Sequence, residues 1–130
     1  MKRLSRQKRI LIVEDEPTIC DIYRRTLADE QFEVSEAPNG LVARRMLTRK
    51  QYDLLLIDLK TPPMSGKELY QWLQEQYPQM TYRVIFTTGD IVGGDTQMFL
   101  ERTGRPYLTK PFTPDELKAI ILETIEQIEQ

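Results

Sequence analysis

The sequence predicts an α/β domain in which helices cover both faces of a doubly wound, five-stranded parallel sheet. First, strand-like and helix-like segments alternate five times along the 130 residues. Second, the strand-like segments are mostly short, continuous apolar runs, as expected for parallel strands that are buried on both faces. Third, the connections are too short for anything but right-handed crossovers between parallel strands.

Five segments have the composition of strands. Residues 54–58 form the most apolar segment of the chain, and residues 32–37 form a weaker strand. The complete set is residues 10–13, 32–37, 54–58, 83–87 and 107–109.

Each strand is followed by a helical pattern. Pro17 stands where the first turn of a helix tolerates proline, with Asp15 or Glu16 before it as a cap. Asn39 and Gly40 open the second helix, and a less regular fourth helix is expected from about residue 95 to residue 103. The third and fifth helices begin with capping boxes, in which a hydroxyl and a carboxylate satisfy main-chain N–H groups. These pairs are Ser65 with Glu68, and Thr113 with Glu116.

The composition excludes several function classes. The chain has 40% hydrophobic and 29% charged residues, enough for one core, and it carries one cysteine and no histidine. An intrachain disulfide, a histidine zinc site and a Ser-His-Asp triad are therefore excluded. The longest apolar runs are far shorter than the ~20 residues that span a bilayer, and no secretory signal is present. We therefore expect a cytoplasmic domain with no membrane partner.

The charge is unevenly distributed. The net charge is −2, yet residues 1–9 carry five basic side chains and no acidic one. A basic arm can contact nucleic acid or a membrane surface, but the acidic remainder offers no footprint for a phosphate backbone. We therefore expect residues 1–8 to be a leader or linker stub, residues 9–130 to be the domain, and nucleic acid not to be a direct partner.

Polar residues follow four of the predicted strands, where the carboxyl ends of a doubly wound sheet form the ligand crevice. Taken alone, Asp15 or Glu16 would be a plain helix cap, but the whole set points to one site. Its members are Glu14, Asp15, Glu16, Asp58, Thr87, Thr88, Asp90 and Lys110.

Converging carboxylates require a proton or a cation. Two of them about 4 Å apart repel by roughly 4 kcal/mol at an effective dielectric constant near 20. Because only oxygen ligands are available, the cation should be hard, and Mg²⁺ fits best.

These residues lie in four stretches that resemble the receiver domain of response regulators in two-component signalling. The stretches are residues 10–16, residues 55–58 followed by Pro62 and Gly66, residues 84–89 and residues 107–112. The resemblance covers essentially residues 9–128. It implies a flavodoxin-like three-layer sandwich with strand order 2-1-3-4-5.

The resemblance implies a role for each acidic residue of the site. Asp58 would be the phosphoacceptor. Glu14 and Asp15 would hold Mg²⁺, with further oxygens from Asp58 and from the main-chain carbonyl of Lys60. The transfer would be self-catalysed and followed by autodephosphorylation, so the domain would not be an enzyme in the ordinary sense.

The resemblance also implies a switch. Thr88, rather than Thr87, would donate its hydroxyl to the phosphoryl group, because it lies thirty residues after Asp58 and precedes a small residue. Lys110 would neutralise the phosphoryl oxygens, and its bond to Pro111 would be cis. Tyr107 would be the aromatic switch residue. The face made by the fourth helix, fifth strand and fifth helix would change shape and offer a homodimer interface.

The absence of histidine makes the chain depend on a partner. The donor imidazole must come from a histidine kinase or a histidine phosphotransfer domain, and the downstream effector is open. Residues 84–89 and 99–104 resemble receivers of hybrid sensor kinases more than those of transcription factors. Gly93 and Gly94 suit either a segment that takes two shapes or an ordinary loop.

Three positions near the site differ from the usual family pattern or stand where the family varies. Thr61 stands where Met is usual in the family, and Lys60 and Asp90 stand where the family tunes attack by water on the phosphoaspartate. Lys60 and Asp90 are either such tuning residues or plain surface residues.

Two other functions fit the predicted sheet. An aspartate-based, Mg²⁺-dependent phosphatase or phosphotransferase usually has a second Asp where Lys60 stands. A flavodoxin-like binding module needs a hydroxyl-rich phosphate loop after the first strand. In this chain residues 14–16, at that place, are acidic and would repel a phosphate.

Overall fold

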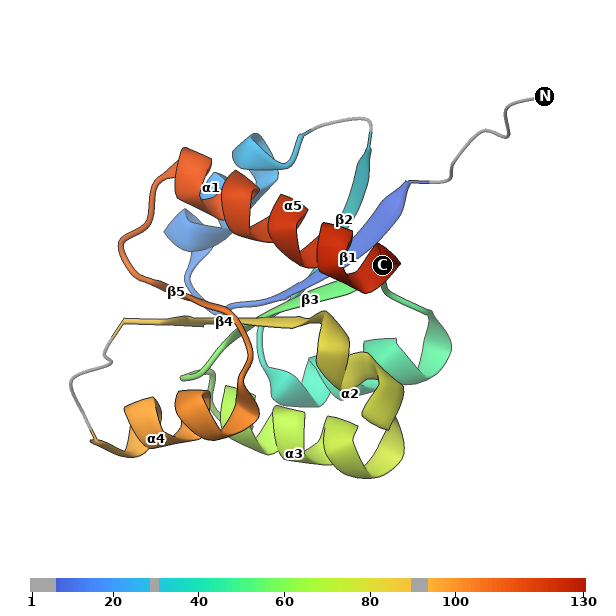
Figure 1. Ribbon diagram of the computed structural model, residues 1–130, viewed down its shortest axis with the longest axis vertical. Helices are drawn as coiled ribbons and strands as arrows, with labels where there is room; N and C mark the ends of the chain where they lie inside the picture. The colour runs from blue at the N-terminus through green and yellow to red at the C-terminus, as the bar shows by residue number, and fades with distance from the viewer. Residues whose placement is uncertain (1–6, 29–30, 90–93) are drawn as a thin grey trace.

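The computed structural model describes residues 7–28, 31–89 and 94–130, and it confirms the predicted fold class. Five parallel strands form one sheet in the order β2-β1-β3-β4-β5. Helices α1 and α5 cover one face of this sheet, and α2, α3 and α4 cover the other (Figure 1). The strands are β1 (Lys8–Val13), β2 (Phe32–Ala37), β3 (Leu54–Asp58), β4 (Val84–Thr88) and β5 (Tyr107–Thr109).

The helices begin where the capping residues predict. The Asn39 side chain accepts a hydrogen bond from the main chain of α2, and both predicted capping boxes are formed at α3 and α5. Glu16 is the N-cap residue of α1, but its side chain makes no capping hydrogen bond. The helices are α1 (Pro17–Thr26), α2 (Gly40–Arg49), α3 (Gly66–Gln76), α4 (Gly94–Thr103) and α5 (Pro114–Glu129).

Three boundaries differ from the sequence prediction. β4 runs from Val84 to Thr88 rather than over residues 83–87, because a 3₁₀ helix, η1 (Pro78–Arg83), occupies the residues before it. β1 begins at Lys8 rather than at residue 10. Lys8 pairs with Phe32, and its ammonium lies 2.6 Å from a carboxylate oxygen of Glu129. The prediction of a leader at residues 1–8 falls mostly on residues 1–6, which lie outside the described residues.

The sheet separates two apolar clusters. One lies between the sheet and α2, α3 and α4, and it contains Leu55, Ile57 and Phe86. The other lies between the sheet and α1 and α5, and it contains Leu54, Leu56 and Ile85. Every residue of β3 and β4 is buried, as expected for central parallel strands. Each fully buried side chain of this size contributes about 1.5–3 kcal/mol of burial free energy.

Within the described ranges, no helix is both long enough and apolar enough to cross a membrane.

Candidate functional site

Three carboxylates meet at the carboxyl edge of the sheet. Glu14 and Asp15 follow β1, and Asp58 ends β3. One oxygen from each of the three lies within 4.8 Å of the other two. Glu14 and Asp58 are buried, with 2% and 5% of their surface exposed, whereas Asp15 is exposed. The predicted convergence of these side chains is therefore observed.

The ammonium group of Lys110 lies among these carboxylates. The Nζ atom of Lys110 is 2.9 Å from Glu14 Oε1 and 3.1 Å from Asp58 Oδ2. It is also 3.8 Å from Glu16 Oε1, so the third acid of the 14–16 run also lies at the site. The main-chain N–H of Lys110 donates to the carbonyl of Thr88 at 2.8 Å, which fixes the residue at the end of β5. The Lys110–Pro111 peptide is cis, as the family resemblance implies.

Main-chain groups hold the Asp58 carboxylate and the residue after it. The N–H of Lys60 donates to Asp58 Oδ1 at 3.1 Å. The N–H of Leu59 donates to the carbonyl of Thr87 at 3.0 Å, which ties the turn after β3 to β4. Asp58 Oδ2 accepts a hydrogen bond from the Lys110 ammonium. One carboxylate oxygen is thus held by the backbone and the other by a cation.

Burial changes the acid–base properties of the site. It raises the pKa of Glu14 to about 7, because the charged form loses its hydration, and the nearby Asp58 charge adds to this effect. The Lys110 ammonium opposes the shift without cancelling it. Burial also lowers the pKa of Lys110, but its contacts with Glu14 and Asp58 outweigh that loss and raise the pKa above its ordinary value. Near neutral pH, Glu14 therefore exchanges a proton.

The donor set fits a hard divalent cation. Glu14 Oε1 is fully buried and lies 2.9 Å from the Lys110 ammonium, with no other polar partner among the described residues. Two other carboxylates lie within 4.8 Å of it. Oxygen donors of this kind suit Mg²⁺, which binds through a few carboxylates and keeps several water molecules. Glu14, Asp15 and Asp58 are the residues that would hold it.

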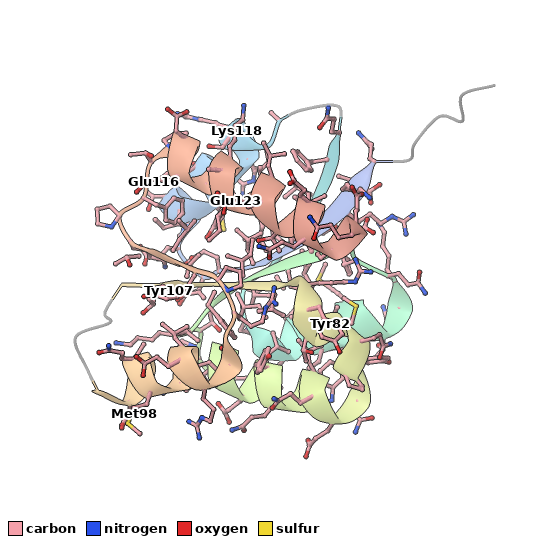
Figure 2. All side chains as sticks on the ribbon, in the orientation of Figure 1. Tyr82, Met98, Tyr107, Glu116, Lys118 and Glu123 are labelled. Atoms are coloured by element: carbon pink, nitrogen blue, oxygen red, sulfur yellow. The ribbon has the colours of Figure 1, made fainter. Side chains whose placement is uncertain are left out.

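The two predicted switch residues lie on neighbouring strands. Thr88 ends β4 and is buried, whereas Tyr107 begins β5 and has 43% of its surface exposed. Figure 2 labels Tyr107 on this edge strand, between α4 and α5. Asp90 and residues 91–93, for which tuning and switching roles were considered, lie outside the described residues.

Thr61 has a structural role. Its side chain is buried, and its hydroxyl donates to the carbonyl of Met64 at 3.1 Å within the turn that follows Asp58. The Pro62–Pro63 peptide in the same turn is also cis, a feature not expected from the sequence. The threonine at this unusual position therefore shapes the turn and does not contact the carboxylates of the site through any observed hydrogen bond.

Comparison with known proteins identifies relatives over most of the chain. The family described as "Response regulator receiver domain" matches residues 10–122. The response regulator protein PilR of Pseudomonas aeruginosa is 34% identical over 119 residues, which cover 91% of this chain. The match covers 26% of PilR, so the chain spans about a quarter of the length of this relative.

Two solved structures share the fold over nearly their whole length. A CheY-like receiver domain protein from Methanospirillum hungatei is 31% identical with a TM-score of 0.84, and the match covers 95% of this chain and 97% of that one. The receiver domain of the sensor histidine kinase PA1611 from Pseudomonas aeruginosa is 27% identical with a TM-score of 0.81, covering 92% and 98%. The PA1611 structure has a magnesium ion coordinated in its active-site cleft.

Proposed function

The chain belongs to the response regulator receiver domains of two-component signalling, and we propose that its Asp58 accepts a phosphoryl group from a phosphohistidine. The observation that carries the proposal is the contact of Lys110 Nζ with Asp58 Oδ2 at 3.1 Å and with Glu14 Oε1 at 2.9 Å. A receiver needs an ionised aspartate with a fixed cation beside it, and these two contacts supply that pair.

Asp58 acts as the nucleophile. One oxygen of its carboxylate forms a bond to phosphorus while the bond from phosphorus to the donor imidazole nitrogen breaks, and the imidazole leaves as a neutral group once protonated. Such transfers depend mainly on positioning and on stabilisation of charge. The Lys60 N–H orients the carboxylate, and the Lys110 ammonium faces the oxygens that gain charge. Hydrolysis of the acyl phosphate, helped by the same residues, ends the signal.

The acidic cluster completes the site. Bound by Glu14, Asp15 and Asp58, Mg²⁺ would supply positive charge to the phosphoryl oxygens. Glu14 would be in its ionised form when it holds the cation, because a carboxylate must lose its proton to act as a ligand. The magnesium ion in the PA1611 receiver supports this assignment.

Phosphorylation of Asp58 changes the face made by α4, β5 and α5, and a partner binds this face. Thr88 donates its hydroxyl to the attached phosphoryl group, and Tyr107 moves from its exposed position toward the space that the threonine leaves. Exposed apolar surface on this face, at Met98 (64% exposed) and Tyr107 (43%), supports a role in contacts with an effector or a second copy. Figure 2 labels both side chains. Spectroscopic signals of Tyr107 that stay unchanged on phosphorylation would contradict the switch.

The donor is a histidine kinase or a histidine phosphotransfer domain, because the chain has no histidine of its own. PilR is a response regulator and PA1611 is a sensor histidine kinase, so receivers like this one occur in both kinds of protein. The hybrid-kinase origin considered from the sequence stays a prediction.

The test is phosphorylation by a small donor. The protein is incubated with Mg²⁺ and acetyl phosphate, and its intact mass is measured. We expect the mass of one phosphoryl group to be added to the wild type and to Asp53→Asn, but not to Asp58→Asn. Asp53 is the matched control, because it stands immediately before the strand that Asp58 ends. An unlabelled wild type, or equal labelling of Asp58→Asn, would overturn the proposal.

A further inference from the structure

Two cavities lie at the amino edge of the sheet, opposite Asp58. Asp53 immediately precedes β3, Arg83 immediately precedes β4, and Arg105 comes shortly before β5. The first cavity has a volume of about 320 Å³ and the second about 310 Å³. Gln79 and Arg83 line both, so the two cavities adjoin each other at these side chains. Pockets that hold small molecules start at about 300 Å³, so each cavity reaches that size.

One wall of the first cavity is apolar. Leu47, Tyr52, Tyr77 and Met80 line it, between the C-terminal end of α2 and the start of η1. Tyr77 also makes an edge contact with Trp72, with ring centroids 5.4 Å apart, which helps to fix this wall. Such a lining suits the aromatic or aliphatic body of a ligand.

Two charged side chains at the rim of the first cavity, Asp53 and Lys50, already have partners within the protein. Asp53 accepts the main-chain N–H of Arg9 at 2.7 Å. The Lys50 ammonium lies 2.6 Å from Glu33 Oε2. Neither group is therefore the main recognition element for a charged ligand.

The second cavity is cationic. Arg83 and Arg105 line it together with Tyr82 and Gln127, and no acidic residue is part of the lining. Across residues 7–28, 31–89 and 94–130, no carboxylate forms an ion pair with either arginine. Burial lowers the pKa of Arg105, as expected for a cation that lacks a nearby anion.

Both guanidinium groups are already held in place. Arg105 donates to the carbonyls of Val84 at 3.0 Å and Tyr82 at 2.7 Å, and Arg83 donates to the carbonyl of Asp53 at 3.2 Å. Each arginine has five N–H donors, so donors remain on both. Fixed guanidinium groups bind carboxylate or phosphate with little further loss of side-chain freedom. The exposed Tyr82, labelled in Figure 2, forms the outer wall on η1.

We propose that these two cavities bind one small amphipathic anion. Its aromatic or aliphatic body lies against Tyr52, Tyr77 and Met80, and its carboxylate or phosphate head lies against Arg83 and Arg105. The site is separated from Asp58 by the length of β3, so binding does not require the phosphoacceptor. A neutral molecule of the same shape loses the contacts with the guanidinium groups.

The test uses ¹⁵N–¹H NMR titration of the full chain with 4-phenylbutyrate. We expect saturable shifts of the Gln79, Arg83 and Arg105 amides, with at least tenfold weaker binding of the neutral 4-phenylbutanamide. Acetate, which has the head without the body, should bind at least tenfold more weakly too. A titration with 2-phenylethyl phosphate compares the two head groups. The anion with the lower Kd, 4-phenylbutyrate or 2-phenylethyl phosphate, carries the preferred head group. Equal binding of the amide, or the absence of saturable shifts at these amides with either anion, would overturn the proposal.

Three variants locate the site. Arg83→Gln should weaken binding of 4-phenylbutyrate at least tenfold, and Met80→Gln should do the same by placing an amide in the apolar cavity. Arg49→Gln is the matched control, because it removes one exposed positive charge that lines neither cavity. Unfolding in urea verifies that each variant is folded. Equal losses of affinity in Arg49→Gln and Arg83→Gln would mean that binding depends only on the net charge of the protein. That result would also overturn the proposal. Asp58→Asn should bind as the wild type does.

Discussion

Gly66 lies so close to Asp58 that a Cβ atom on Gly66 would stand 2.6 Å from the Asp58 carbonyl oxygen. The same Cβ atom would stand 2.8 Å from the Cα atom of Leu59. The N–H of Gly66 donates to the carbonyl of Leu59 at 3.1 Å, so α3 begins directly against the end of β3. The absence of a side chain at Gly66 thus permits the position of the proposed phosphoacceptor.

Gly66→Ala should therefore destabilise the protein and disturb the site. Because the two nearest of the clashing atoms belong to the backbone, they can move only by shifting the turn after Asp58, and overpacking of this kind costs roughly 1–3 kcal/mol. Gly94→Ala is the matched control. Gly94 is also the first residue of its helix, but a Cβ atom there meets no atom of the described residues within 4 Å. We expect urea unfolding to show a loss in the first variant and no loss in the second. Equal effects would contradict the steric explanation.

The raised pKa of Glu14 predicts how stability depends on pH in the absence of metal. The folded protein holds the Glu14 proton up to about pH 7, whereas the unfolded chain releases it near the ordinary value of 4.5. Between these values the folded state binds more protons, so the Glu14 contribution to the free energy of unfolding falls as pH rises. Below pH 4.5 this contribution is fully present, and above about pH 7 it is lost.

Urea unfolding in a chelator, repeated from about pH 4 to pH 8, measures this dependence. Glu14→Gln carries no titrating group at this position, so its stability should fall less over the same range. Saturating Mg²⁺ should reverse the trend in the wild type, because the cation competes with the proton for Glu14 and binds better as pH rises. Parallel profiles for the two proteins in the chelator would contradict the assignment to Glu14.

Much of this site could be predicted from the sequence, because parallel strands bring their carboxyl ends to one edge. Asp58 and Lys110 are 52 residues apart in the chain and still meet, as the alternation of strands and helices requires. Thr88 could be placed for the same reason. The helix starts were predictable at α3 and α5, since their capping boxes depend on residues close in sequence.

Other features depend on packing between distant segments and could not be predicted. The pKa of Glu14 reflects how completely the surrounding elements exclude water from its side chain. The exposure of Tyr107 depends on the side-chain conformation on an edge strand, which composition does not specify. The η1 helix lies in a stretch without a marked apolar period, and it packs against α3 without burying any of its own residues. The sequence shows an isolated glycine at position 66, after the turn. It does not show that this glycine allows the close approach of α3 to the end of β3.

Cys20 should be unreactive in the folded protein. It is 6% exposed, and burial raises its thiol pKa to about 11 from the ordinary value of 9.0. At about pH 8 the folded protein therefore holds roughly 100-fold less thiolate than the unfolded chain, and the thiolate is the reactive form. The absorbance change with Ellman's reagent should be slow in buffer and fast in concentrated urea. Fast modification in buffer, with the protein still folded, would contradict this burial of the thiol.

Lys110→Ala should destabilise the metal-free protein more than any exposed lysine substitution does. It removes the cation that contacts both Glu14 and Asp58, whose side chains are 0% and 6% exposed. Removing one partner of a buried ion pair costs about 3 kcal/mol or more, because the remaining charge has lost both its hydration and its partner. Lys118→Ala, on the outer surface of α5 (Figure 2), is the control and should change the stability by less than about 0.5 kcal/mol.

Mg²⁺ should restore more stability to Lys110→Ala than it adds to the wild type. In the wild type Mg²⁺ competes with the Lys110 ammonium for Glu14 and Asp58, whereas in the variant this competitor is removed from the buried carboxylates. Urea unfolding in a chelator and in saturating Mg²⁺ gives the increment for each protein. An increment that is equal in Lys110→Ala, Lys118→Ala and the wild type would show that the cation binds away from these carboxylates. A larger increment in Lys110→Ala alone, abolished when Glu14→Gln is added, would assign the metal to the cluster that Lys110 contacts.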